Sequence, residues 1–583
     1  MLATVLDKFL PASPERLTGL APALVERRVR LFAVLAALCI SATYLLLINR
    51  FWHVSSDSGL YLALARSLRE GHGYAFAGLP YGKAPPGWPF ILSLLMAVSG
   101  EFLWLNVVQC LAMLAALAVL YLALRQVADG ANALLVLFLT AMLFWSHEYA
   151  VALMSETPFF LFSNLALLCL LTLLNTRTER YRALLLAGIC AAWTMAFWCR
   201  LLACFWFGPF VFALLFGSRR TRPVRHRLLG AAFVAAVVAL SLLIYMQWAN
   251  KMAQAALQAP GAVAQAPGGA PPRVRYLPPA TDPHSVMRAV LRLPRWFLLV
   301  LCPPWEGVLR PVLPGPAIAV GHLACTAVVL LGAAAVLRRG QALAGGSLLF
   351  FLPFVLSAPG YKVTTGRYAI AVAPFVVLLF LTGLATIGEF AQKRLHRRLT
   401  KRLLVNAGIA FILLPNGLLL AGDIWIQRRP DFYAAYRGGA YAQLMGMARW
   451  LERAQVRELV ASSDATSRRT VATLTHAPVV RLPKRALGAR PPAADRAKQY
   501  ARDYGARYII TLDRSQPWPT WHIPKHYLGG GVPNAPYWQL YEYDAAQDAL
   551  RPIEAQPEQR WPTRIPIEQR IPARAPPGPA RTP

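Results

Sequence analysis

The sequence predicts a polytopic all-α membrane protein with a small C-terminal α/β domain. Hydrophobic residues make up 56% of the 583 residues and charged residues only 15%, and the mean hydropathy is +0.42. Soluble domains usually contain roughly 45–50% apolar and 25% charged residues. Long apolar runs also recur between residues 31 and 421. A run of about 20 apolar residues is long enough to cross a bilayer as a helix.

Eleven apolar runs are long enough, or nearly long enough, to be membrane spans. They cover 31–49, 103–124, 131–149, 157–174, 183–199, 201–217, 228–248, 315–337, 343–358, 368–388 and 403–421. Short basic loops between spans favour the cytoplasmic side, and this chain has them at 177–182, 219–227, 338–339 and 393–402. The N-terminus is then cytoplasmic, and 183–217 is a hairpin with its tip near Arg200. The C-terminus and the loops 50–102, 150–156, 249–314 and 359–367 lie outside.

The distribution of charge argues against a nucleic-acid-binding protein. The chain has 60 Lys and Arg against 27 Asp and Glu, a formal net charge of +33. Much of the excess lies in short clusters beside apolar runs, such as Arg27, Arg28 and Arg30, and not in a continuous basic stripe. The eight cysteines all lie in or beside apolar runs, so we expect them to be buried apolar residues without disulfides.

The first outer loop, 50–102, is predicted to contain structure of its own. A helix-like stretch at 59–70 precedes a proline-rich segment with Lys83, Pro85, Pro86 and Pro89. The apolar piece 90–98 that follows is too short to span, so we expect an amphipathic or re-entrant element at the membrane surface.

From about residue 430 the composition changes. Helix-like stretches at 440–455, 467–475 and 494–504 alternate with strand-like stretches at 458–462, 479–482 and 507–512. This alternation predicts a small α/β domain with a parallel sheet over 430–552. The transmembrane domain would cover 1–425, and the Pro- and Arg-rich tail 553–583 is expected to be disordered.

Carboxylates near the outer membrane surface are the first candidates for chemistry. Asp57 lies close to the depth of the lipid head groups, where a carboxylate can accept a proton from a hydroxyl. It also precedes the predicted helix at 59–70, and on local evidence alone a capping role is the favoured alternative, compatible with the chemical one. Glu156 opens the fourth span, where the helix dipole favours an acid for structural reasons as well. Glu148, beside His147 at the end of the third span, is a weaker candidate.

Three cations are predicted on the same side: Lys83 in the proline-rich loop, Arg200 at the hairpin tip and Arg367 just before a span. Fixed cations of this kind suit a phosphate. A solvated lysine and arginines that reach up to the head groups are the structural alternatives. Metal-binding patterns such as HExxH are absent, so no cofactor is required by the sequence. The carboxylates are nevertheless of a type that binds Mg²⁺ or Mn²⁺.

The order of these motifs resembles that of the GT-C membrane glycosyltransferases, in particular the protein O-mannosyltransferase and lipid A aminoarabinose transferase group. The likeness covers about residues 30–425. The segments that resemble the motifs of this group are Asp57 to Tyr61 in the first outer loop, Lys83 to Pro89 (a "KPP" loop), Met154 to Phe159 (an "SEP" entry), Arg200 at the hairpin tip, and Gly366 to Pro374 (an "RY…P" span). This chain departs from the group at Ser58, where mannosyltransferases often carry Glu, and at Ala84, which separates Lys83 from the prolines.

The resemblance implies a fold and a reaction. The protein would be a GT-C-like enzyme of the bacterial inner membrane, with about 11 transmembrane helices and with interfacial helices in the first outer loop. It would transfer a sugar, by inversion, from a polyprenyl-phosphate-linked donor to a lipid, glycan or protein acceptor. Asp57 would be the general base and Glu156 would position sugar or acceptor, while Lys83, Arg367 and Arg200 would bind the donor phosphate. The remaining candidates for substrate contact are Tyr61, His53, Glu148 and Tyr368.

Two other functional classes remain open. A transporter or lipid flippase would also place charges near the membrane, although such proteins often contain inverted repeats and none is evident in this sequence. The third class is a non-catalytic scaffold whose C-terminal domain binds a partner.

Overall fold

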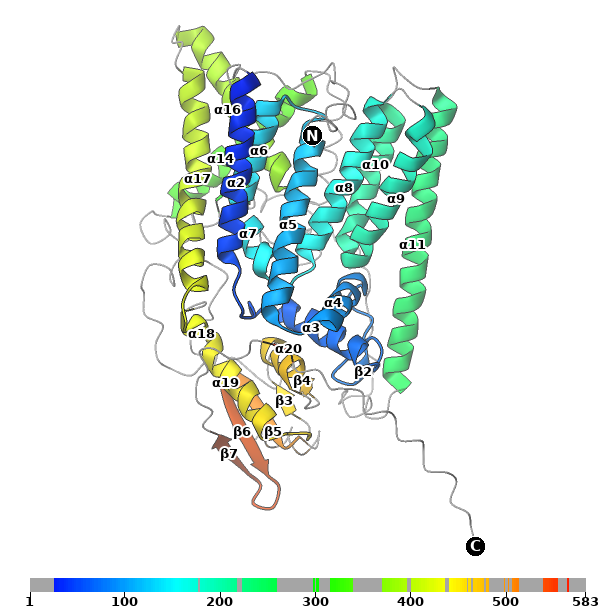
Figure 1. Cartoon of the computed structure of the whole chain (residues 1–583), viewed down its shortest axis with the longest axis vertical. Coiled ribbons are helices and arrows are strands. Elements are labelled where there is room, and N and C mark those ends of the chain that lie inside the picture. The colour runs from blue at the N-terminus through cyan, green and yellow to red at the C-terminus, as the bar shows by residue number, and fades with distance from the viewer. Residues whose placement is uncertain are drawn as a thin grey trace.

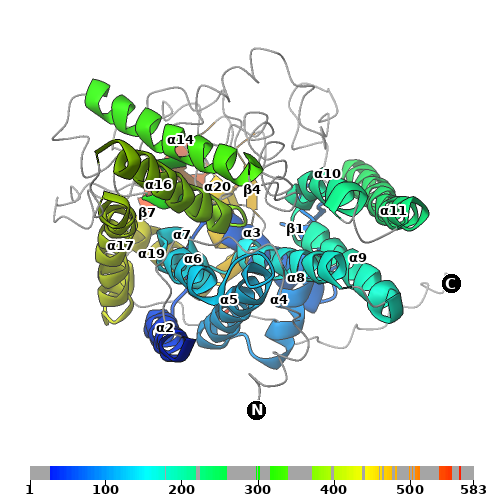
Figure 2. The same cartoon turned by 90° about the horizontal axis from the view of Figure 1, so that it is seen from above.

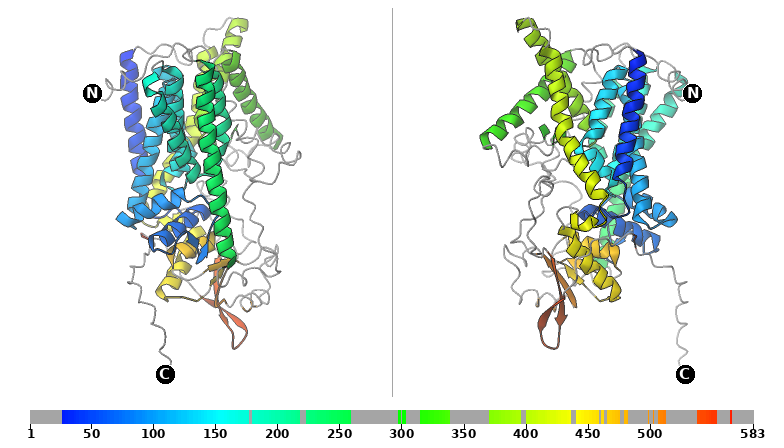
Figure 3. Two further views of the ribbon diagram at one scale, coloured as in Figure 1. Left: turned by 90° about the vertical axis from the view of Figure 1, so that its right-hand side faces the viewer. Right: turned by 60° about the vertical axis from the view of Figure 1, so that its left-hand side comes forward.

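A bundle of long helices stands on a smaller layer made of the first outer loop and the C-terminal segment (Figure 1). The computed structural model describes residues 26–176, 179–217, 223–258, 297–298, 300–302, 315–338, 370–395, 400–435, 440–458, 460–462, 465–475, 479–481, 498, 502, 506–512, 538–553 and 564–565. Seen from the side, the two layers meet at one end of the bundle (Figure 3). That meeting place holds the residues that the sequence singles out.

Seven of the described helices are long and apolar enough to cross a membrane. They are α5 (Phe102–Leu124), α8 (Glu156–Asn175), α9 (Arg182–Cys199), α11 (Val224–Gln258), α14 (Gly315–Arg338), α16 (Ala373–Leu395) and α17 (Thr400–Gln427). Viewed from above, α14, α16 and α17 lie on one side of the bundle, α9 and α11 lie on the other, and α5 and α8 lie between them (Figure 2). The chain is therefore a multi-pass membrane protein.

The count of eleven spans stays a prediction. The run 343–358 lies outside the described residues, and 31–49 falls in α2 (Glu26–Leu47), whose apolar part is shorter than a typical span. The run 201–217 is divided into a 3₁₀ turn (Leu201–Trp206), a short helix α10 (Phe207–Phe212) and a π-helical turn (Ala213–Gly217). Helix α11 continues to Gln258, so residues 249–258, which the sequence assigns to a loop, are helical.

The third predicted span, 131–149, is not one straight helix. It forms α6 (Gly130–Met142) and α7 (Phe144–Val151), which are bent by 60° at Leu143. Asn416 of α17 accepts a hydrogen bond from the backbone N–H of Phe144 at 2.8 Å, and so satisfies a donor that the bend leaves without a helical partner. The same side chain donates to the carbonyls of Leu301 and Ile412, at 2.8 and 2.7 Å.

The first outer loop forms the inner part of the smaller layer. It contains α3 (Ser56–Arg69), two short strands β1 (Ala75–Phe76) and β2 (Leu79–Pro80), and α4 (Gly87–Val98). On α4, Phe90, Leu94 and Val98 are exposed on one face, and Trp88, Leu92 and Met96 are buried on the other. An apolar stripe at this spacing on a helix too short to span suits the membrane surface, as expected for 90–98.

The C-terminal segment supplies the outer part of this layer. Helices α18 (Phe432–Ala435), α19 (Ala440–Arg453) and α20 (Ala465–Leu474) accompany a five-stranded sheet in the order β4-β3-β5-β6-β7. The strands are β3 (Val460–Ser462), β4 (Val479–Arg481), β5 (Tyr508–Leu512), β6 (Trp538–Asp544) and β7 (Ala549–Ile553).

The sheet is mixed and not purely parallel as the sequence suggests. Strand β3 pairs in parallel with β4 and β5, and these three strands lie where the sequence predicts them. Strands β6 and β7 pair antiparallel because only residues 545–548 connect them, a length that makes a hairpin and not a crossover. Part of the tail expected to be disordered is also held. The N–H of Ile565 donates to the carbonyl of Gly100 at 3.0 Å, and its side chain is 2% exposed.

Candidate functional site

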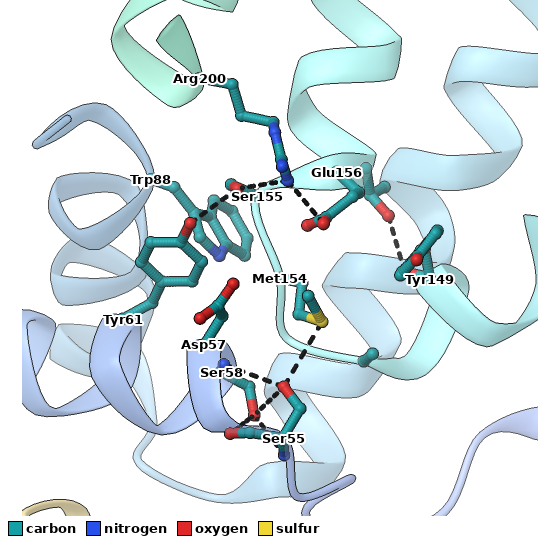
Figure 4. A network of polar contacts seen from close by, with 12 residues as sticks. Ser55, Asp57, Ser58, Tyr61, Trp88, Tyr149, Met154, Ser155, Glu156 and Arg200 are labelled. Carbon is teal, nitrogen blue, oxygen red and sulfur yellow. Dashed lines mark hydrogen bonds and ion pairs between the residues drawn. The ribbon is translucent and has the colours of Figure 1, made fainter. Parts of the chain in front are cut away.

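The candidate site lies where α3, the segment between α7 and α8, and the end of α9 meet (Figure 4). Two polar residues of α5, three positions apart and therefore on one face, fix the approaches to it. Asn106 donates to the carbonyls of Asn49 and Phe51, at 3.0 and 2.9 Å, in the chain that leads to α3. Gln109 donates to the carbonyls of Tyr149, Ala152 and Met154, at 3.1, 2.9 and 3.1 Å, in the chain that leads to α8.

Asp57 lies in the first turn of α3 but does not cap it. Ser55 is the N-cap: its hydroxyl accepts from the N–H of Ser58 at 3.0 Å, and the Ser58 hydroxyl accepts from the N–H of Ser55 at the same distance. This reciprocal pair is a capping box. The capping role considered for Asp57 is therefore wrong. The Asp57 side chain is 22% exposed and lies beside Tyr61 and the Met154–Ser155 segment (Figure 4).

Glu156 and Arg200 form a buried ion pair. Arg200 Nη1 lies 2.5 Å from Glu156 Oε1, and the two side chains are only 8% and 1% exposed. Glu156 is the first residue of α8, as the sequence predicts. Arg200 follows the last residue of α9, where the backbone leaves the helix and turns the side chain toward the site. A buried charge pair is costly to break, so these two residues hold each other in place.

A hydrogen-bonded chain connects this ion pair to α3. Arg200 Nη1 donates to the Ser155 hydroxyl at 3.3 Å, and that hydroxyl donates to the Tyr61 phenol at 3.1 Å. Burial raises the pKa of Tyr61 well above its ordinary value, and Asp57 adds to the rise. The phenol therefore keeps its proton at any physiological pH. Since it accepts from Ser155, it can donate that proton toward the space that it shares with Asp57.

The proline-rich loop is held firmly, but its lysine is exposed. Tyr74 donates its phenol proton to the carbonyls of Ala84 and Pro85, at 3.0 and 3.2 Å, and Tyr245 of α11 donates to that of Gly82 at 3.4 Å. A Cβ at Gly82 would meet the carbonyl oxygen of Ala249 at 2.9 Å, so only glycine permits this close approach. Within the described part of the chain, Lys83 itself forms no ion pair.

The other predicted residues are distributed unevenly. Arg367 and Tyr368 lie outside the described residues. His53 is buried, with its ring centroid 5.2 Å from that of Phe432. Glu148 is buried on α7, and its neighbour His147 lies 3.1 Å from a carboxylate oxygen of Asp423 on α17. Among the described residues, no group of three or more His, Cys, Asp or Glu side chains is placed to hold a metal ion.

Sequence reasoning missed the cation that contacts Asp57. Arg469 of α20 places Nη1 2.8 Å from Asp57 Oδ1. It was assigned only to a helix of the C-terminal region, because nothing local relates two residues that are 412 positions apart. Sequence reasoning also missed Ser155 as a connecting hydroxyl, although Ser155 lies within the Met154 to Phe159 motif that contains Glu156.

Comparisons with known proteins give a family match over part of the chain and several solved structures of similar fold. A family model described as dolichyl-phosphate-mannose-protein mannosyltransferase matches residues 83–245. The oligosaccharyltransferase AglB from Archaeoglobus fulgidus, solved with an inhibitory peptide and a dolichol-phosphate, is 14% identical with a TM-score of 0.52, over 83% of this chain and 69% of that one. The same enzyme solved with Zn and sulfate is also 14% identical, with a TM-score of 0.53, over 82% of this chain and 68% of that one. ArnT from Cupriavidus metallidurans, in the apo state, is 13% identical with a TM-score of 0.48, over 82% of this chain and 92% of that one.

The resemblance to the GT-C membrane glycosyltransferases is confirmed at the level of the fold. No curated protein sequence matches the chain significantly. The family match covers the proline-rich loop, the Met154–Ser155–Glu156 segment and Arg200, which are three of the motifs that carry the resemblance. The match and the shared fold together support glycosyl transfer as the general activity.

Proposed function

We propose that this protein transfers a sugar from a polyprenyl-phosphate-linked donor to a hydroxyl of a lipid, glycan or protein acceptor on the outer face of the bacterial inner membrane. The N-terminus would be cytoplasmic and the C-terminal segment periplasmic. The observation that carries the proposal is the meeting of Asp57, Tyr61, Glu156 and Arg200 at one end of an apolar bundle whose fold is similar to that of an oligosaccharyltransferase.

In the proposed reaction, Asp57 is the general base of a single inverting displacement. The acceptor oxygen attacks the anomeric carbon, its proton passes to the Asp57 carboxylate, and the bond from that carbon to the phosphate oxygen breaks. The polyprenyl phosphate leaves with the electron pair. It is a good leaving group at neutral pH, so fixed cations stabilise its charge without a protonating acid. General base catalysis contributes about 10²- to 10⁴-fold.

The other candidate residues take supporting roles in this proposal. Lys83 is on a stiff loop with its ammonium group exposed, which suits the donor phosphate, and Arg367 is the second cation for that group. Arg200 is engaged with Glu156 and Ser155, so it orders these residues around the sugar or the acceptor. Tyr61 presents a neutral phenol beside the base. His53, Glu148 and Tyr368 remain candidates for substrate contact, and Mg²⁺ or Mn²⁺ for an optional cofactor.

Substitution of Asp57 by Asn tests the proposal. The full-length protein, in lipid nanodiscs, is given a panel of undecaprenyl-phosphate-linked hexoses and pentoses with a cell-envelope acceptor fraction, and free undecaprenyl phosphate and glycosylated product are quantified by mass spectrometry. We expect turnover by the wild type and a loss of about 100-fold or more in Asp57→Asn, because the acceptor proton loses its base.

The matched control is Asp129→Asn. Asp129 caps α6 through its side chain, and Asn caps equally well, so turnover should not change. Near wild-type turnover in Asp57→Asn would contradict the proposed mechanism. Movement of the lipid across the membrane without any glycosylated product would favour a flippase.

A further inference from the structure

The Asp57 carboxylate is held by an arginine from the far end of the chain. Arg469 Nη1 lies 2.8 Å from Asp57 Oδ1, and the two side chains are 16% and 22% exposed, so the pair is largely shielded from water. Asp57 is in the first turn of α3, whereas Arg469 is on α20, which belongs to the C-terminal segment. An ion pair in this partly shielded position is stronger than one on an open surface.

Helix α20 is docked against α3 at further points, which fixes where Arg469 can lie. A Cβ at Gly59 would come within 3.1 Å of Arg469 Cβ, so the two helices touch backbone to backbone at this glycine. The Thr473 hydroxyl donates to the carbonyl of Gly59 at 2.8 Å, and Arg66 donates to the carbonyl of Thr473 at 2.9 Å. These contacts leave the Arg469 side chain little freedom to turn away from Asp57.

Other charged and titratable groups face the same carboxylate. On its own helix there is Tyr61, and from the loop before α4 there is Tyr81, whose pKa is raised by burial and lowered by Arg469 and Arg468. The Arg200–Glu156 pair also lies near Tyr61 and brings no net charge. Among the described residues, Arg469 contacts the Asp57 carboxylate directly, and its neighbour Arg468 adds positive charge around Tyr81.

We propose that Arg469 is a positioning residue of the transferase: it holds Asp57 ionised and oriented toward the acceptor hydroxyl, which makes the C-terminal segment part of the catalytic machinery. This inference rests on the proposed function, because it assigns Asp57 the role of base. The inference goes beyond the proposed function because it gives the C-terminal segment a chemical task. A cation beside a carboxylate favours the charged form of that carboxylate, and the ion pair with the docked Arg469 restricts the rotamers of Asp57.

The test compares Arg469→Gln and Arg469→Lys in the full-length protein. With the undecaprenyl-phosphate-linked sugar panel, we expect Arg469→Gln to lower kcat by about 10- to 100-fold, a part of the general-base contribution, with the donor KM changed less than about twofold. Without the cation the carboxylate is protonated more easily, so the acidic limb of kcat/KM moves to higher pH by about one unit or more. Arg469→Lys keeps the charge and should recover most of the rate and of the original limb.

Arg453→Gln is the matched control. It removes the same charge from the C-terminal segment, in the last turn of α19, where the Arg453 side chain is exposed. The kcat of this control and the acidic limb of its kcat/KM profile should match those of the wild type. All variants should have melting temperatures within a few degrees of the wild-type value. A wild-type rate and limb in Arg469→Gln would overturn the inference, as would a rise in donor KM at constant kcat, which would make Arg469 a phosphate ligand.

Measuring Asp57→Asn beside these variants separates the two proposals. If Asp57→Asn is inactive and Arg469→Gln behaves as the wild type, the inference fails and the proposed function stands. If Asp57→Asn keeps wild-type turnover, the assignment of Asp57 as base fails, and the inference fails with it.

Discussion

At the scale of single residues, the site depends on hydroxyls that carry hydrogen bonds between charged groups. Ser155 joins Arg200 to Tyr61, and Tyr61 in turn lies beside Asp57. Neither hydroxyl is charged, yet each fixes the direction in which its neighbour donates. Removal of one hydroxyl should therefore disturb the geometry around Asp57, the proposed base, without changing the net charge of the site.

Replacement of Tyr61 by Phe should lower kcat by about 10-fold while the protein stays folded, because the loss is one hydrogen bond worth about 1–1.5 kcal/mol. Since burial raises the pKa of the phenol, Tyr61 should contribute no alkaline limb below its ordinary value of about 10. The measurement is the pH profile of turnover for the wild type and Tyr61→Phe. An alkaline limb near pH 8 that disappears in Tyr61→Phe would contradict this reading.

At the residue scale, several candidates that the sequence takes from short motifs lie close together, while their chemical roles stay a prediction. Asp57, Tyr61, Glu156 and Arg200 are neighbours in the structure, and each belongs to a motif that the sequence shows. Sequence reasoning failed for Asp57 as a cap, because Ser55 with Ser58 makes the better local pair. It also failed to find Arg469, since the pairing of residues 412 positions apart depends on the tertiary fold.

At the scale of elements, α5 is the scaffold of the site. Asn106 and Gln109 are both buried, and between them they donate five hydrogen bonds to carbonyls of the segment before α3 and of the end of α7 with the turn that follows it. In an apolar bundle no water is available to donate hydrogen bonds to these carbonyls, so side chains must do so. The apolar sequence of α5 predicts a span, but it does not reveal which of its polar side chains face backbone and which face substrate.

Replacement of Gln109 by Leu should destabilise the protein by about 2–4 kcal/mol, because three buried carbonyls lose a donor. The segment before α8 should loosen as well, so turnover should fall together with the melting temperature in detergent. Leu111→Val on the same helix is the control, since Leu111 is 52% exposed and faces away from the core. Equal melting temperatures for Gln109→Leu and the wild type would refute the scaffold role.

At the scale of the whole molecule, hydropathy and loop charge predicted a layered organisation. The multi-pass bundle, the outer loop with its own helices and three strands of the C-terminal segment lie where the sequence indicated. The bend between α6 and α7, the length of α11 and the β6–β7 hairpin were not predicted. In each case an apolar run or a short strand is compatible with more than one geometry, and packing partners decide.

The proposed orientation can be tested by single exposed cysteines. Ala545, in the β6–β7 hairpin, and Arg225, near the start of α11, are both exposed. The β6–β7 hairpin lies at the end of the molecule that holds the smaller layer (Figure 1), and the predicted topology puts the start of α11 on the cytoplasmic side. A membrane-impermeant maleimide should label Ala545→Cys in intact spheroplasts and Arg225→Cys only after permeabilisation. The parent protein is the control for the eight native cysteines. The reverse labelling pattern would invert the topology.

The contact between Asp57 and Arg469 has a consequence for how the protein assembles during its synthesis. The ribosome makes Asp57 long before Arg469, and the helices in between must enter the bilayer first. In the proposed topology, the C-terminal segment must be exported and must dock on α3 before the Asp57 carboxylate gains its counter-charge. With the role proposed for Arg469, products of premature termination should therefore be inserted in the membrane yet inactive.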